Sequence, residues 1–198
     1  MAAHSDLTAE ITGLAVIGCW LGVVAILITG KRKAAPGTWR RDRKSMLGLL
    51  LQSAGYLICL ALLRPVFSPP FSMSRMSERV LAVLTAALAL GSTYFCYVAA
   101  RALGRHWALM ARVIKGHQLV RTGPYAVVRN PIYLAMLGVV IATGLAFSYW
   151  QALVPAVVVY LVGTAIRIRA EEKLLGATFG PEFADYRRRV PALLPRLL

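Results

Sequence analysis

The chain has 198 residues, of which 58% are hydrophobic and only 16% are charged, yet its formal net charge at pH 7 is +15. A soluble basic domain that binds nucleic acid needs a larger share of charged surface than this, and the high apolar content excludes a disordered chain. The three cysteines make no even disulfide framework. The composition therefore predicts an all-α integral membrane protein with its basic residues concentrated on one side of the bilayer.

Five apolar segments approach the roughly 20 residues that a helix needs to cross a bilayer. In chain order they cover residues 7–29, 45–67, 77–103, 131–147 and 149–168. The first segment follows Asp6 and is followed by Lys31-Arg32-Lys33. That charge order is the reverse of a secretory signal peptide, so we interpret the segment as a membrane span.

Two local signals refine these segments. Ser77, with Glu78 directly after it, is the expected N-cap of the third span. Only a few residues near 148–150 separate the last two spans, which therefore form a C-terminal helical hairpin, with Tyr149 and Trp150 suited to an interfacial turn. Arg167 and Arg169 at the end of the last span are interpreted as side chains that snorkel to the membrane surface.

The basic residues predict the orientation of the chain. Twenty of the 23 lysines and arginines fall in residues 31–45, in residues 101–130 and in the tail from residue 167. With five spans, this bias places the N-terminus outside and the C-terminus in the cytoplasm, and a bacterial inner membrane is the expected location. We expect one integrated membrane domain, with a three-span region over residues 1–100 and a cofactor-binding, catalytic region with cytoplasmic interfacial segments over residues 101–198.

The segment from residue 117 to residue 135 is the first candidate site. It combines one histidine, two arginines and two tyrosines: His117, Arg121, Arg129, Tyr125 and Tyr133. A turn at Gly123-Pro124 and a helix that opens at Pro131 can bring the basic side chains and free helical N–H groups onto one anion. The alternative is a turn that only returns the chain to the membrane.

Two further patterns lie near the C-terminus. Glu171 and Glu172 are adjacent acids in a chain that has few, and their side chains point about 100° apart on a helix. One can therefore face a cation or an amino group while the other pairs with a neighbour such as Lys173, although a salt-bridged helix face is an equal alternative. Residues 179–195 predict a turn at 180–181 and a short amphipathic helix, for which an anchor at the membrane surface is favoured over a direct catalytic role.

These residues are similar to two ordered motifs of the integral-membrane methyltransferase superfamily, which contains isoprenylcysteine carboxyl methyltransferases and phospholipid N-methyltransferases. The first motif is matched by His117, Leu119, Gly123, Pro124, Tyr125, Arg129, Pro131 and Tyr133. The second is matched by Glu171, Glu172, Phe179, Gly180 and Tyr186. Asn130 stands where the family usually has histidine, and Ala135 where it usually has glycine. Asparagine does not titrate near neutral pH, so Asn130 has no proton-transfer role.

The resemblance implies that S-adenosylmethionine is the methyl donor, with S-adenosylhomocysteine as product, in a pocket between the last two spans and the cytoplasmic segments. The implied cofactor-binding residues are His117, Leu119, Gly123, Tyr125, Arg129, Asn130, Tyr133, Glu171 and Glu172. Arg129, Glu171 and Glu172 are the implied catalytic residues, with Arg129 on the cofactor carboxylate and a glutamate on its amino or ribose group. We expect neither a metal site nor a nucleic-acid partner.

Three functions remain open from the sequence. The first is methyl transfer to a lipidic acceptor, with a prenylcysteine-type carboxylate as the foremost candidate. The second has a phospholipid or another amine as acceptor. The third is a non-catalytic lipid-binding or carrier protein, which is disfavoured because transporters place polar groups near the bilayer midplane and these spans have almost none there.

Overall fold

The computed structural model describes residues 7–33, 43–64, 74–104 and 119–194. Within these ranges the chain is all-helical, and its only extended pairing is an isolated bridge between Leu63 and Ser148. The helices are α1 (Leu7–Lys33), α2 (Arg43–Cys59), α3 (Arg75–Leu103), α4 (Pro124–Val127), α5 (Pro131–Phe147), α6 (Trp150–Phe179) and α7 (Pro181–Arg189).

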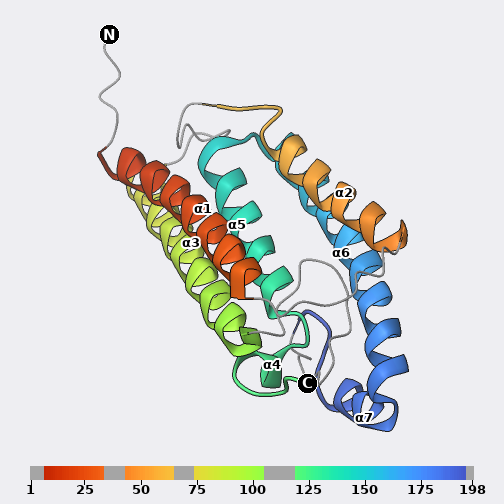
Figure 1. Ribbon diagram of the computed structural model, residues 1–198. Coiled ribbons are helices and arrows are strands. Elements are labelled where there is room, and N and C mark those ends of the chain that lie inside the picture. The colour runs from red at the N-terminus through yellow and green to blue at the C-terminus, as the bar shows by residue number, and fades with distance from the viewer. Residues whose placement is uncertain (1–6, 34–42, 65–73, 105–118, 195–198) are drawn as a thin grey trace.

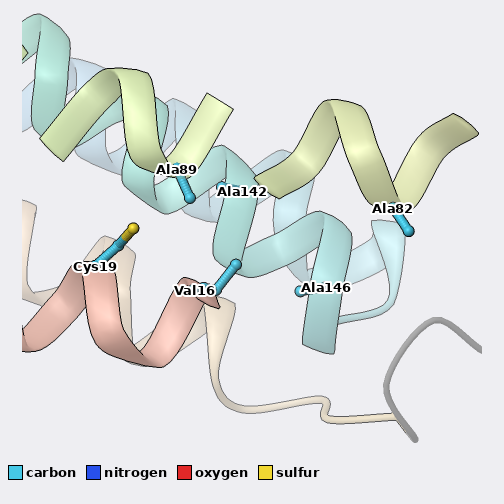
Figure 2. Close-up of a cluster of buried hydrophobic side chains, with 6 residues drawn as sticks. All are labelled: Val16, Cys19, Ala82, Ala89, Ala142 and Ala146. Atoms are coloured by element: carbon cyan, nitrogen blue, oxygen red, sulfur yellow. The ribbon is translucent and has the colours of Figure 1, made fainter. Parts of the chain in front are cut away.

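Helices α1, α3 and α5 lie side by side, whereas α2 runs along α6 on the other side of the molecule (Figure 1). Small side chains fill the interior of the first group: Val16, Cys19, Ala82, Ala89, Ala142 and Ala146. In Figure 2, Val16 and Cys19 point from α1 toward the alanines of α3 and α5. Small residues let helices approach closely, which is how helices gain packing energy in a lipid environment.

Glycines bring α2 and α6 into direct backbone contact. A Cβ atom on Gly48 would lie 2.5 Å from Cγ of Arg167 and 2.7 Å from the carbonyl oxygen of Gly163. A Cβ atom on Gly163 would in turn lie 2.7 Å from the carbonyl oxygen of Gly48. No other residue type fits at these two positions without moving a backbone, so this glycine contact fixes how α2 sits on α6.

Three helices among the described residues are long and apolar enough to cross a membrane: Leu7–Gly30, Arg75–Leu103 and Trp150–Phe179. The two other expected spans are shorter helices, α2 and α5, with 17 residues each. At about 1.5 Å per residue they measure about 25 Å, less than the roughly 30 Å of a bilayer core. Of the five expected spans, three are therefore supported as full membrane spans, and α2 and α5 are not.

Three predicted boundaries were wrong. The second segment was expected to be helical to residue 67, but α2 ends at Cys59, and Arg64 donates at 2.7 Å to the carbonyl oxygens of both Leu145 and Ser148. The last span was expected to end at residue 168, but α6 continues to Phe179, because the polar turns after the apolar run are rich in good helix formers. The N-cap of α3 is Ser74, whose hydroxyl accepts from the N–H of Ser77.

Candidate functional site

The turn and the helix start predicted between residues 123 and 131 are both present. Gly123 has a φ of +60°, a conformation that glycine adopts without strain, and Pro124 opens α4. Pro131 occupies the first position of α5, where its missing N–H leaves no hydrogen bond unmade. The short segment between α4 and α5 thereby presents Arg129 and Asn130 toward α6 and the C-terminal segment.

Glu172 of α6 and Arg129 form a nearly buried ion pair. The Nε and Nη2 groups of Arg129 donate to Oε1 of Glu172 at 2.9 and 2.6 Å. Nη1 of Arg129 donates to the carbonyl oxygens of Arg187 and Val190. The second oxygen of Glu172 lies 3.5 Å from Nε of Arg187. These contacts use four of the five N–H donors of a guanidinium, so Arg129 joins α5, α6 and the end of α7 at one point.

Glu171 has a different set of partners. The hydroxyl of Tyr133 donates to its Oε1 at 2.5 Å, and Nη2 of Arg167 lies 3.5 Å from the same oxygen. No hydrogen-bond donor contacts the other oxygen, Oε2, in the part of the chain that the structure describes. The side chain of Glu171 is 22% exposed. The two acids therefore differ: Glu172 is paired with two arginines, whereas Oε2 of Glu171 accepts no hydrogen bond from the described residues. Neither pairs with Lys173, the partner suggested by the sequence.

Helix α7 and the residues after it pack onto this corner. The hydroxyl of Tyr186 donates to the carbonyl oxygen of Tyr125 at 2.7 Å. The main-chain N–H and the Nδ2 group of Asn130 both donate to the carbonyl oxygen of Ala192, at 3.1 and 2.9 Å. Leu193 packs against the cluster of Leu137, Val140 and Tyr160. The apolar face of α7 is therefore buried in the protein, so the interpretation of this helix as only a membrane-surface anchor was incomplete.

A small, open cavity of about 90 Å³ lies among these elements. Its walls combine apolar and polar residues: Leu103, Leu119, Val120, Leu175, Phe183, Tyr125, Arg129, Asn130, Glu171, Glu172 and Tyr186. Burial raises the pKa of Tyr125 well above its ordinary value and that of Tyr186 to about 12. Both hydroxyls are therefore protonated near neutral pH and act as neutral hydrogen-bonding groups.

Six of the nine predicted cofactor-binding residues line this cavity: Leu119, Tyr125, Arg129, Asn130, Glu171 and Glu172. Tyr133 reaches the site through its hydrogen bond to Glu171, and Gly123 shapes the turn before α4. His117 lies outside the described residues. Arg121, expected to join an anion site, forms a half-exposed ion pair with Glu182 at 2.9 Å.

Sequence reasoning missed the importance of Arg167. Interpreted as a snorkelling residue, it is instead 3% exposed, and its Cζ lies 5.1 Å from the centre of the Tyr133 ring. The missed signal was its position inside a membrane helix one turn before an acid, since an ionisable residue within a span is a functional candidate by default. The described residues contain no group of three or more His, Cys, Asp or Glu side chains that could hold a metal ion.

Comparison with known proteins gives two curated relatives. The chain is 41% identical over 97 residues to the nickel-cobalt-cadmium resistance protein NccN of Alcaligenes xylosoxydans xylosoxydans. It is 39% identical over 97 residues to the cobalt-zinc-cadmium resistance protein CzcN of Cupriavidus metallidurans. Each match covers 48% of this chain and 45% or 44% of the relative, so the chain spans less than half the length of the curated relatives it matches.

The sequence pattern of the family described as phospholipid methyltransferase matches residues 80–182. That range contains α4, α5 and α6 and both acids of the cavity. The resemblance to membrane methyltransferases is thus confirmed at the level of the family. Because the match extends over more than half of its residues, the chain belongs to the phospholipid methyltransferase family.

Proposed function

We propose that the protein is an S-adenosylmethionine-dependent methyltransferase of the bacterial inner membrane that acts on a lipidic acceptor. The observation that carries the proposal is the cavity wall, where a carboxylate with one unused oxygen, Glu171, lies among apolar and aromatic side chains. Two helices that are long and apolar enough to cross a membrane, α3 and α6, contribute to the cavity wall, which suits a protein whose acceptor arrives from the bilayer.

The residues present fit the proposed cofactor. Its amino group and ribose hydroxyls are hydrogen-bond donors, and Oε2 of Glu171 is an acceptor without a protein donor among the described residues. The faces of its adenine suit the apolar wall formed by side chains such as Leu119, Leu175 and Phe183. Its carboxylate suits the remaining N–H of Arg129. Glu171, Arg129 and the apolar wall would therefore hold it.

When bound, the cofactor supplies a methyl group on a sulfonium centre, whose transfer requires no protein nucleophile. The contribution of the chain is then to orient the two reactants and to keep water out, and alignment alone can supply several kcal/mol of rate enhancement. Tyr133 and Arg167 hold one oxygen of Glu171 in place, which leaves that carboxylate pre-oriented for a ligand. The Arg129–Glu172 pair holds α7 and the residues after it over the same cavity.

The family description favours a phospholipid amine as acceptor over the prenylcysteine-type carboxylate that the sequence placed first. The two acceptors differ in proton chemistry. An ammonium headgroup must lose a proton before its nitrogen attacks a methyl group, whereas a carboxylate is already nucleophilic at neutral pH. The rate with an amine acceptor should therefore rise with pH between about 6 and 9, whereas the rate with a carboxylate should stay flat.

The test is transfer of a labelled methyl group by the purified protein to vesicles of phosphatidylethanolamine and, in parallel, to a farnesylcysteine. We expect label in a lipid fraction, and we expect Glu171→Gln to reduce it at least tenfold. Glu182→Gln is the matched control, because Glu182 is an exposed glutamate paired with Arg121 that does not line the cavity. If no acceptor is labelled and the donor does not bind, the proposal fails and a non-catalytic lipid-binding or carrier protein replaces it.

A further inference from the structure

A continuous row of polar contacts runs from α2 to the cavity through the interior of the protein. The Nε2 group of Gln52 donates to Oγ1 of Thr164 at 2.8 Å, and Nη1 of Arg167 donates to Oε1 of Gln52 at 3.2 Å. Nη2 of Arg167 then lies 3.5 Å from Oε1 of Glu171, which also accepts from Tyr133. Gln52 lies outside residues 80–182, so the family match assigns it no role.

The glycine contact between α2 and α6 buries this row. Gln52 is 5% exposed and Arg167 is 3% exposed, because Gly48 and Gly163 allow the two backbones to touch beside them. A cation taken out of water requires partners for its charge and its N–H groups. Gln52 and Glu171 are two of those partners, and they contact different nitrogens of the same guanidinium.

The position of the guanidinium therefore reflects both of these contacts. On one side it is held by the amide of Gln52, and on the other it faces the carboxyl group of Glu171 and the ring of Tyr133. Without the amide oxygen, the guanidinium loses one of the contacts that fix its position, and we expect it to move toward the carboxylate of Glu171. A second strong donor on that carboxylate changes its orientation and occupies the oxygen that a ligand needs.

We propose that Gln52 is a positioning residue for the cofactor site: by holding Arg167 it fixes Oε1 of Glu171 and keeps Oε2 available to a bound ligand. This inference rests on the proposed function, because the ligand in question is the methyl donor. It assigns a role in the site to α2, which contributes no residue to the cavity wall itself.

The test is a double-mutant cycle read by calorimetric titration of S-adenosylhomocysteine into the full chain in detergent, with thermal unfolding of every variant. Gln52→Leu removes the amide, and Glu171→Gln removes the negative charge and one of the two acceptor oxygens of the carboxylate through which Gln52 is proposed to act. Gln52→Glu restores an acceptor for Arg167. Ser53→Ala is the control on the same helix, because the hydroxyl of Ser53 is exposed and bonds only within α2.

We expect Gln52→Leu to raise the Kd about tenfold, the typical effect of disturbing one hydrogen bond to a charged group. In the Glu171→Gln background the same change should alter the Kd less than twofold, because coupled residues are not additive. Gln52→Glu should regain most of the affinity, and Ser53→Ala should match the wild type. If Gln52→Leu does not fold, Thr164→Val serves in its place, because it removes the hydroxyl that accepts from the Gln52 amide. We expect Thr164→Val to raise the Kd about threefold in the wild-type background and to leave it unchanged in the Glu171→Gln background.

Three results would overturn the inference alone. The first is an unchanged Kd in Gln52→Leu, and the second is a Kd in the double variant that has risen by the product of the two single-variant fold-changes. The third is a lower unfolding temperature of Gln52→Leu without a change in its Kd. An unchanged Kd in Glu171→Gln would overturn both this inference and the assignment of Glu171 to the cofactor. A wild-type protein that binds neither S-adenosylhomocysteine nor S-adenosylmethionine would overturn the proposed function together with the inference.

Discussion

The ion pair between Arg129 and Glu172 allows a sharp prediction, because a direct role on the cofactor and a role in holding α7 lead to different outcomes. The side chains are 9% and 13% exposed, so solvent screens the pair only weakly. Glu172→Gln leaves the guanidinium without its main counter-ion, which in a nearly buried pair destabilises by about 3 kcal/mol. That energy corresponds to about a hundredfold rise in the population in which α7 is detached.

Limited trypsin digestion measures that population, because α7 ends in three consecutive arginines, Arg187 to Arg189. When opening and closing are fast, cleavage tracks the equilibrium between attached and detached forms. We expect Glu172→Gln to accelerate cleavage there by up to about a hundredfold and to weaken S-adenosylhomocysteine binding in parallel. Arg129→Lys should have a similar effect, since one ammonium cannot reach both the carboxylate and the two carbonyl groups that the guanidinium spans.

The matched control is Glu182→Gln, which breaks an exposed ion pair on the same helix and should change cleavage less than about threefold. The neutral double variant Arg129→Gln with Glu172→Gln should recover part of the protection, because no unpaired charge is left buried. If trypsin cleaves Glu172→Gln at the wild-type rate while the Kd for S-adenosylhomocysteine is raised, the ion pair does not hold α7. That result would indicate instead that Arg129 and Glu172 contact the ligand directly.

Three further outcomes are expected. Gly48→Leu should separate α2 from α6 and lower the unfolding temperature more than Gly18→Leu, because a Cβ on Gly18 meets no atom within 4 Å. Tyr186 has a pKa raised to about 12 by burial, so its contribution to stability is fully present below pH 10 and is lost as the pH rises toward 12. Tyr186→Phe should therefore flatten the loss of stability between pH 10 and 12 in an unfolding titration. Fusions of alkaline phosphatase after residue 104 and after residue 194 should both be inactive if the basic segments are cytoplasmic, and an active fusion would contradict that orientation.

The local structure of the candidate site was largely predictable from the sequence. Proline fixes its own φ and glycine permits a positive φ, so the turn at Gly123-Pro124 and the start of α5 at Pro131 could be placed without a structure. The helical hairpin followed in the same way from two apolar runs with almost nothing between them. As their 100° separation suggested, Glu171 and Glu172 have different partners, although both line the cavity.

The pairing between distant segments was not predictable. The contact between Gln52 and Arg167 joins residues 115 positions apart, and hydropathy along one helix does not identify the helix that packs against it. The same limit applies to Ala192, whose carbonyl oxygen accepts both hydrogen bonds from Asn130. The end of α6 was missed because apolar runs mark the membrane core, whereas a helix continues wherever its residues favour it.

Photo-crosslinking tests the cofactor site most directly. S-adenosylmethionine with a labelled methyl group is irradiated with the full-length protein in detergent, and the labelled peptides are identified by mass spectrometry. We expect label within residues 119–133 or 171–186, which line the cavity and neighbour it, and we expect unlabelled S-adenosylhomocysteine to abolish it. Labelling that the competitor does not reduce, or that falls within α1 instead, would contradict the assignment of this cavity to the methyl donor.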